Sequence, residues 1–310
     1  MENLYPIWVW AAFIGLILFS VALDLGLLRK WQSRPGSAPP PGLWPALRWS
    51  LLWFLLAMIV AAAVTWRGGT DDGLQFLTGY LVEYSLSLDN VFAMALIFAY
   101  FRVAPDQQHR VLFWGIFGAL VMRGLMIGVG AGLLAQFHWF YYVMGAFLLW
   151  TGLRWGFSKQ AMLEPGKNRI VLLAQKVFPV APESTRFFGR VDGRRALTPL
   201  ALALLTVEAT DLIFATDSIP AIFAVTTTPF IIFSSNLCAV LGLRSLYFLL
   251  AAALRHFRYL KTGLALVLIF IGAKMLISFW RPIPTSITLA AIVALLGLSA
   301  LLSVLKPQNS

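Results

Sequence analysis

Long apolar runs separated by short polar stretches dominate the chain. A helix that crosses the hydrocarbon core of a bilayer needs about 20 mostly apolar residues. Windows of that length predict membrane-spanning helices over nine ranges: 7–28, 46–66, 74–101, 111–134, 138–157, 198–225, 230–254, 262–280 and 286–305. The first range lacks a basic start and contains Asp24, so we interpret it as a retained helix and not as a signal peptide.

The composition is that of a membrane protein. Of the 310 residues, 60% are hydrophobic and 12% are charged, whereas soluble domains average about 45–50% apolar and about 25% charged residues. This excess excludes a soluble enzyme, a disordered chain and a fibrous repeat. The one cysteine, Cys238, excludes a disulfide framework and any cysteine-based zinc or redox motif.

The formal net charge of +11 orients the predicted spans. In a soluble protein it would suggest a nucleic-acid partner, which we do not expect here. With the N-terminus outside, 19 of the 24 Lys and Arg residues fall in cytoplasmic loops and helix ends, and only Arg67 and Arg281 lie outside. The other three, Arg123, Arg244 and Lys274, fall within spans. The positive-inside rule therefore predicts an N-out, C-in topology.

One predicted cytoplasmic loop, 158–197, is long and carries eight cations. Its stretch 170–178 mixes apolar and polar residues. Two interpretations stay open: an amphipathic segment drawn to anionic lipid on the inner surface, or a solvated linker between two halves.

Six of the 13 acidic residues fall within predicted spans: Asp24, Glu83, Asp89, Glu208, Asp211 and Asp217. An aspartate at mid-helix costs about 2.5–3.5 kcal/mol, so six without compensation would cost about 15–20 kcal/mol. They must face the protein interior or a wet cavity. Some could form fixed structural ion pairs with the three buried cations, but the excess of acids leaves negative charge that a divalent cation or bound protons would balance.

The acidic residues lie in a repeated motif of an acid, five residues, an aspartate and a small polar residue. Its two copies are Glu83 to Asp89 and Asn90, and Asp211 to Asp217 and Ser218. Weaker likeness continues downstream, between 119–126 and 239–247 and between 145–149 and 272–276. The third to fifth spans thus match the sixth to eighth. Because each unit has three helices, the copies would run in opposite directions, which is an inverted repeat typical of transporters.

The sequence therefore predicts an all-α polytopic membrane protein with about nine transmembrane helices. We divide it into 1–73 with the first two helices, 74–157 as the first repeat, 158–197 as the basic cytoplasmic loop, 198–280 as the second repeat, and 281–310 as the last helix and tail.

Oxygen atoms predominate among the candidate ligands. Pro220 lacks an N–H and clashes with the carbonyl four residues back, so the Thr216 carbonyl beside Asp217 should be freed, although a simple helix kink is an equal alternative. Carboxylates, an amide, hydroxyls and carbonyls suit Mg, Ca or Mn. Met94 could add a softer ligand that favours Mn(II), although packing is its alternative role.

Three stretches resemble one family. They are Glu83–Asn90, Arg110–Gly115 and the pattern from Phe187 to Phe223, and they are similar to the TerC/Alx integral membrane proteins. The resemblance implies a bacterial inner-membrane protein of the LysE-type transporter superfamily, associated with manganese export and tellurium resistance. It maps the family's motif onto Glu83, Asp89, Asn90, Glu208, Asp211, Asp217 and Ser218. Thr216 replaces the valine expected before the second aspartate.

Our first hypothesis is a secondary transporter that exports Mn(II) by alternating access. Asp89 and Asp217 would be the central ligands, completed by Asn90, Ser218 and the Thr216 carbonyl. Glu83, Glu208 and Asp211 would be further ligands or proton carriers. Asp24 would receive the ion or pair with Lys274. Arg123 and Arg244 would neutralise the negative charge of the site when no ion is bound. Because no ATP-binding motif is present, we expect H⁺ or Na⁺ antiport, with no permanently bound cofactor.

Two other functions stay open. Cations at mid-depth would suit export of an anionic solute, an amino acid or an oxyanion. A non-transporting membrane protein could instead deliver metal to exported enzymes or organise a stress complex. We do not expect an enzyme, because no Ser–His pair, His-Glu-x-x-His sequence or paired protease aspartates occur.

Overall fold

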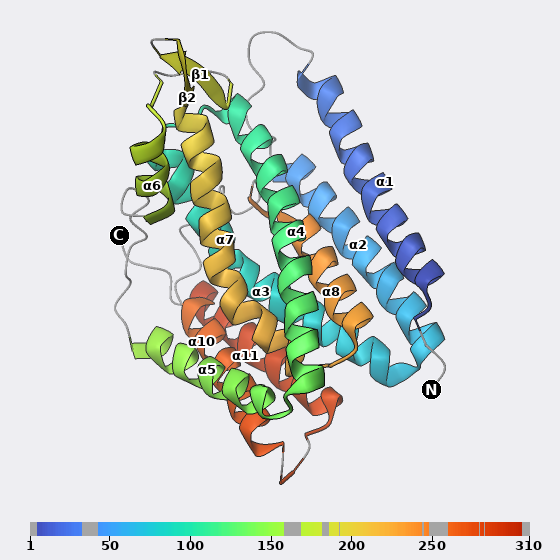
Figure 1. Ribbon diagram of the computed structural model, residues 1–310. Helices are drawn as coiled ribbons and strands as arrows, with labels where there is room; N and C mark the ends of the chain where they lie inside the picture. Colours follow the sequence, from blue (N-terminus) through green and yellow to red (C-terminus); the bar gives the residue numbers. More distant parts are fainter. Residues whose placement is uncertain are drawn as a thin grey trace.

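The chain folds into long helices and one small β-hairpin (Figure 1). The computed structural model describes residues 5–32, 43–157, 169–181, 186–191, 193–243, 245–247, 260–278, 280–281 and 283–305. The helices are α1 (Ile7–Gln32), α2 (Leu43–Gly68), α3 (Thr70–Tyr100), α4 (Pro105–Gln136), α5 (Trp139–Phe157), α6 (Arg169–Val177), α7 (Pro199–Phe223), α8 (Pro229–Leu241), α10 (Leu260–Ile277) and α11 (Thr285–Leu305). The strands are β1 (Phe188–Val191) and β2 (Arg194–Leu197).

Each of the nine predicted spans overlaps a helix. Among the described residues, five helices are long and apolar enough to cross a membrane: α2, α3, α4, α7 and α11. The described parts of α1, α8 and α10 form shorter apolar helices. The structure thus confirms a mostly helical membrane protein. The last residues of the predicted seventh span, 248–254, lie outside the described part of the chain.

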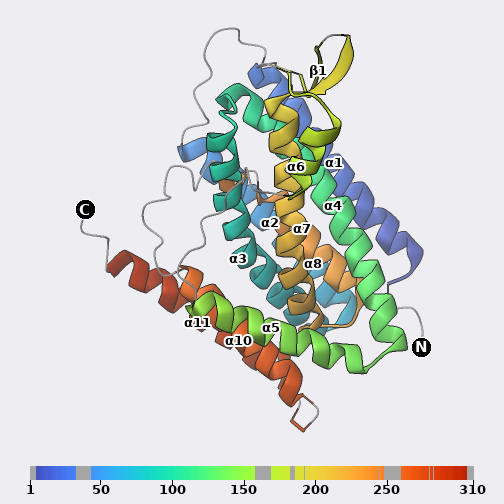
Figure 2. The same cartoon turned by 60° about the vertical axis from the view of Figure 1, so that its left-hand side comes forward.

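Two helices form the centre of the molecule. Within the most apolar window of each helix, 61% of α3 and 56% of α7 is buried, against 17% of α11. α3 and α7 contact each other, α3 also packs against α8, and α7 also packs against α4. In both ribbon views α5, α10 and α11 lie obliquely to this central bundle (Figures 1 and 2). Side chains of α3 and α7 that point inward are therefore the ones most fully removed from lipid.

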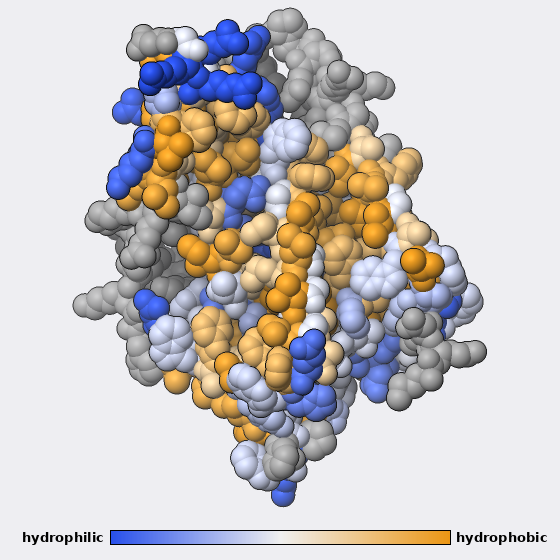
Figure 3. Space-filling view, viewed as in Figure 1, coloured by the Kyte–Doolittle hydropathy of each residue, from blue (hydrophilic) through white to orange (hydrophobic). Residues whose placement is uncertain are grey.

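The outer surface is apolar where it would meet lipid. Large apolar side chains such as Leu55, Leu125 and Ile213 are exposed. In the space-filling view an apolar zone covers the middle of the face, and hydrophilic side chains gather at the hairpin end (Figure 3). This distribution is the reverse of a soluble protein's and fits a bilayer as the surrounding solvent.

Proline and threonine define where several helices begin. Pro105, Pro199 and Pro229 are the first residues of α4, α7 and α8, a position where the missing N–H has no intrahelical partner to lose. The Thr198 hydroxyl caps α7 by accepting the Ala201 amide at 3.3 Å. Gly69, which separates α2 from α3, has φ 88° and ψ 177°, a positive-φ backbone conformation open essentially to glycine alone.

The long loop between the halves carries regular structure that the all-α prediction omitted. α6 covers most of the stretch that the sequence predicted as amphipathic or as linker, and β1 pairs antiparallel with β2. Thr198 donates to the Arg186 carbonyl at 2.7 Å and contacts the Phe187 carbonyl at 3.1 Å. These bonds join the hairpin directly to the first turn of α7.

α5 and α10 approach closely through two glycines. A Cβ atom on Gly272 would lie 2.6 Å from the Leu149 amide nitrogen and 2.8 Å from the Gly145 carbonyl oxygen. Reciprocally, a Cβ on Gly145 would lie 3.3 Å from the Gly272 carbonyl oxygen. Small residues permit such backbone contact between membrane helices, where packing replaces the hydrophobic driving force.

This contact predicts the effect of adding one methyl group. Gly272→Ala should lower the stability of the protein by about 1–3 kcal/mol, because the methyl meets backbone atoms that cannot move aside. Gly297→Ala on α11 is the matched control, since a Cβ there has nothing within 4 Å. Thermal unfolding in detergent should show a clear drop for the first variant and little change for the second. Equal melting temperatures would contradict the packing.

Candidate functional site

A buried arginine joins the two central helices. Arg123 of α4 is 1% exposed and forms ion pairs with Glu83 of α3 and Asp211 of α7. Its Nη2 lies 2.9 Å from Asp211 Oδ1, and its Nε donates to Asp211 Oδ2 at 3.3 Å. The ion pair between Arg123 and Asp211 is therefore bidentate, the geometry in which a guanidinium binds a carboxylate most strongly.

Neutral side chains complete this network. Asn236 of α8 donates to Glu83 Oε2 at 2.9 Å, and Asn90 of α3 donates to Asp211 Oδ1 at 3.0 Å. The Ser87 hydroxyl donates to Glu83 Oε1 at 3.2 Å. Four helices, α3, α4, α7 and α8, thus meet at one polar cluster, which we call the Arg123 network and define as Glu83, Ser87, Asn90, Arg123, Asp211 and Asn236.

The sequence did not identify Asn236 or Ser87 as part of the site. Both are neutral, so no charge in the sequence marks them as candidates. A signal was present, because Ser234, Ser235 and Asn236 form a polar run inside an apolar helix. All three are fully buried, and a buried polar residue in a membrane helix requires a partner.

The charges of the Arg123 network do not balance. One guanidinium faces two carboxylates, so the ionised cluster carries one net negative charge. Removing ions from water is expensive unless they are paired and hydrogen-bonded, and here every oxygen of the two carboxylates has a donor. These hydrogen bonds therefore stabilise the net negative charge of the network in the protein interior.

The residues that follow the two motif aspartates have unsatisfied oxygens. Asn90 Oδ1 and Ser218 Oγ are buried and find no hydrogen-bond partner among the described residues. The two positions correspond in the sequence repeat. A buried polar atom without a partner costs about 1–3 kcal/mol, and such atoms call for an explanation such as a bound ion or water.

The motif aspartates themselves lie at different depths of burial. Asp89 on α3 is half-buried, whereas Asp217 on α7 is 8% exposed. Asp217 faces the hydroxyl of Thr151 of α5, which is buried. The surroundings of Asp217 thus contain two buried hydroxyl groups, those of Thr151 and Ser218.

A small cavity adjoins the Arg123 network. It measures about 10 Å³, and Asn90, Asp211, Thr210 and Met94 contribute to its lining. About 10–15 Å³ is the space that one water molecule requires. The cavity is thus sized for a single small particle, and its inner surface is apolar although Asn90, Thr210 and Asp211 border it.

The other predicted site residues are distributed around this centre. Glu208 is half-buried and lies against Gly118 of α4, because a Cβ on that glycine would meet its carboxylate. The Thr216 side chain is exposed and donates to the Ile213 carbonyl at 2.6 Å, so only its backbone carbonyl remains a candidate ligand. Lys274 is buried and donates to the Ala224 carbonyl at the end of α7, at 3.2 Å.

Some predicted roles fall outside the described residues. The Asp24 side chain and Arg244 are among these, so the pairing of Asp24 with Lys274 stays a prediction. In the part of the chain that is described, no three His, Cys, Asp or Glu side chains gather into a metal-binding group. The eight proposed ligands do not form one shell here, because Arg123 occupies the space between Glu83 and Asp211.

The Arg123 network predicts a large effect of removing its cation. Arg123→Gln should destabilise the protein by about 3–5 kcal/mol, since it leaves two buried carboxylates without a counter-charge. The triple variant Glu83→Gln, Arg123→Gln, Asp211→Asn should recover much of that loss, because no charge remains buried. Thermal unfolding and yield in detergent measure both. A triple variant as unstable as the single one would contradict the charge-compensation argument.

Known proteins match the chain along most of its length. The profile of the integral membrane protein TerC family matches residues 68–310. An uncharacterized membrane protein of Myxococcus xanthus, STKORF319, is 45% identical over 304 residues, covering 97% of this chain and 93% of its own. The putative membrane-bound redox modulator Alx of Escherichia coli K12 is 41% identical over 305 residues, covering 95% of this chain and 94% of its own. No solved structure matches. The chain therefore belongs to the TerC family of integral membrane proteins.

Proposed function

We propose that the protein is a secondary transporter that exports Mn(II) from the bacterial cytoplasm by alternating access. The observation that carries the proposal is the pair of buried oxygens Asn90 Oδ1 and Ser218 Oγ, directly after the two motif aspartates, which have no hydrogen-bond partner among the described residues. A buried oxygen of this kind is suited to a cation. Oxygen donors of this kind favour Mg, Ca or Mn, and Met94 beside Asn90 favours the softest of the three.

The packing of the helices supports an inverted repeat. In the sequence alignment α3 corresponds to α7, α4 to α8 and α5 to α10. The contact of α3 with α8 then corresponds to that of α7 with α4, and both contacts are present. The corresponding glycines Gly145 and Gly272 each approach the carbonyl of the other. Such reciprocity is expected around a pseudo-two-fold axis, and transporters of this design bind their substrate near it.

In this mechanism Asp89 and Asp217 are the central ligands, assisted by Asn90, Ser218 and the Thr216 carbonyl. Arg123 compensates Glu83 and Asp211 in the state without cargo. Movement of either repeat would change how tightly Arg123 holds these carboxylates, and so would release them as further ligands or as proton carriers. Glu208 lies on the same helix as Asp211 and close to it in sequence. It is a third candidate to bind the antiported ion, H⁺ or Na⁺.

The proposed topology has nine spans with the N-terminus outside, in the inner membrane. The hairpin, the end of α3 and the beginnings of α4 and α7 lie at one end of the bundle (Figure 1), and the hydrophilic surface of Figure 3 lies at that same end. The positive-inside rule assigns this end to the cytoplasm. The functional division into two repeats, 74–157 and 198–280, separated by the loop 158–197, remains part of this proposal.

The buried cations argue against export of an anionic solute. Arg123 is already bound by two carboxylates, and Lys274 already donates to a carbonyl. An oxyanion would have to displace these protein oxygens. The relatives named redox modulator raise a second alternative, but Cys238 is buried and is the one cysteine of the chain, so it has no second thiol for dithiol chemistry. We therefore propose a transporter and not an enzyme.

Transport by the purified protein tests the proposal. Proteoliposomes that contain the protein and a Mn(II)-sensitive dye should show saturable Mn(II) flux without any added partner. Asp89→Asn and Asp217→Asn should each slow the initial rate about tenfold or more, as loss of a metal-site residue typically does. Asp71→Asn, an exposed carboxylate in the first turn of α3, should leave the rate unchanged.

Two results would overturn the proposal. Full flux in both central variants would exclude Asp89 and Asp217 as ligands. No flux from well-folded wild-type protein would favour the metal-delivery or stress-complex alternative.

A further inference from the structure

The second repeat is preceded by a compact basic module. It consists of α6, the extended residues 179–181 and the hairpin β1–β2. The Ala181 amide donates to the Leu197 carbonyl at 2.8 Å, and the Leu197 amide donates to the Pro179 carbonyl at 2.9 Å. Val171 of α6 is buried against Leu197, Ala201 and Leu202. The module is thus fixed to the first turns of α7, at the level where that helix enters the proposed bilayer.

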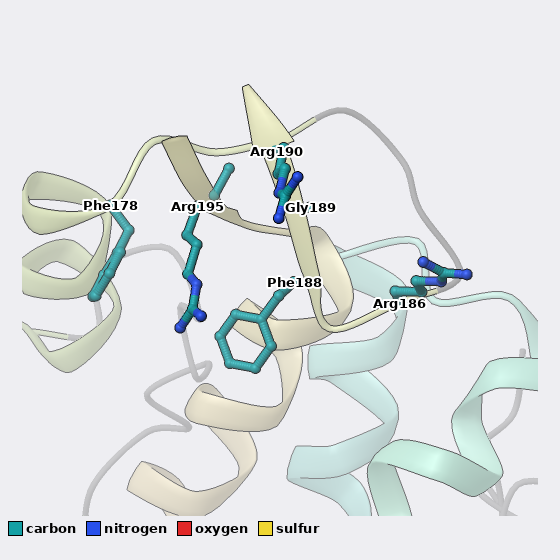
Figure 4. Close-up of a pocket in the computed structure, with 7 residues that line it drawn as sticks. Phe178, Arg186, Phe188, Gly189, Arg190 and Arg195 are labelled. Atoms are coloured by element: carbon teal, nitrogen blue, oxygen red, sulfur yellow. The ribbon is translucent and has the colours of Figure 1, made fainter. Parts of the chain in front are cut away.

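A hollow of about 920 Å³ lies within this module. Phe178, Arg186, Phe188, Arg190 and Arg195 line it (Figure 4). In the close-up, Arg195 and Phe188 reach down from the two strands into the space that Phe178 borders on the α6 side. Because side chains alternate along a strand, Phe188 and Arg190 share one face of β1. An apolar floor and a cationic rim are thereby combined in one site.

The register of the hairpin places two like charges directly opposite each other. Arg190 pairs with Arg195 across the two strands. Side chains at such positions have Cβ atoms about 4.5–5.5 Å apart, and like charges there destabilise the sheet. Neither arginine has a carboxylate partner among the residues the structure describes. An anion held between them would remove this repulsion, and guanidinium groups bind phosphate oxygens in a bidentate manner.

Apolar side chains of the module remain uncovered. Leu173 is 61% exposed, Val177 71% and Phe188 66%. Phe188 lies two residues from Arg190 on the same face of β1, and Arg190 is also exposed. In the sequence, 169–198 carries six cations and two acids, Glu183 and Asp192. A basic surface with protruding apolar groups, beside the end of a membrane helix, is complementary to an anionic lipid interface.

We propose that this hollow binds the phosphate of an anionic phospholipid headgroup in the adjacent leaflet. Arg190 and Arg195 hold the phosphate, Arg186 adds charge at the rim, and Phe188, Leu173 and Val177 insert among the upper acyl carbons. The site goes beyond transport, because its ligand is a component of the membrane and not cargo. Bound lipid would fix the position of the hairpin, and through Thr198 that of the first turn of α7.

Lipid binding to the full-length protein in detergent tests this proposal by native mass spectrometry. Phosphatidylglycerol should bind at least about tenfold more tightly than phosphatidylcholine, since each arginine near an anionic surface contributes about a factor of five. The variant Arg190→Gln, Arg195→Gln should lose this preference. The matched control Lys176→Gln, Arg194→Gln removes two charges of the same module that do not line the hollow, and it should keep the preference within about twofold.

One further variant and two competition experiments identify the ligand. Phe188→Ser should weaken phosphatidylglycerol binding, and soluble glycerol 1-phosphate should not displace the lipid. Displacement by glycerol 1-phosphate would show that the ligand is a soluble phosphate and not a lipid. Displacement by a short single-stranded RNA would show that it is a nucleic acid. If the matched control loses the preference for phosphatidylglycerol equally, the preference comes from general surface charge, and the proposed site is wrong. Melting temperatures within a few degrees of wild type establish that each variant is folded.

Discussion

The structure depends on one cation buried among helices that would otherwise carry uncompensated charge. Arg123 binds Glu83 and Asp211, and Asn236 and Asn90 occupy carboxylate oxygens that the guanidinium leaves. In a membrane interior these groups stabilise the fold only as a set, because removal of any one leaves another unpaired. The network joins α3, α4, α7 and α8, whose mutual contacts form the centre of the molecule.

In the proposed transport mechanism, the same arrangement would let a cation enter a core that is otherwise apolar. The Arg123 network satisfies its own oxygens, whereas Asn90 Oδ1 and Ser218 Oγ are left over beside the motif aspartates. The paired charges thus lie in the Arg123 network, whereas the oxygens that can still accept a ligand lie beside the motif aspartates. α5 and α10 meet at Gly145 and Gly272, where their backbones come into close contact.

The sequence predicted the helices well because bilayer thickness makes apolar length a direct signal. It also predicted that Glu83 and Asp211 must be compensated, since charges in a membrane cannot be left alone. It could not choose Arg123 over Arg244 or Lys274, because that choice depends on which helices touch. Asn236 escaped notice because it is neutral. The hairpin escaped notice although the sequence pair Asp192-Gly193 is a typical signal for a two-residue hairpin turn, because its strands are short and rich in arginine.

Equilibrium binding of Mn(II) to the purified protein tests the central claim most directly. The electron paramagnetic resonance signal of aqueous Mn(II) is lost on binding and can be titrated without any transport. Wild-type protein and Asp71→Asn should show the same saturable loss of signal, and Asp89→Asn and Asp217→Asn should each abolish or strongly weaken it. No saturable binding by wild-type protein, or equal binding by all four proteins, would contradict a cation site at the motif aspartates.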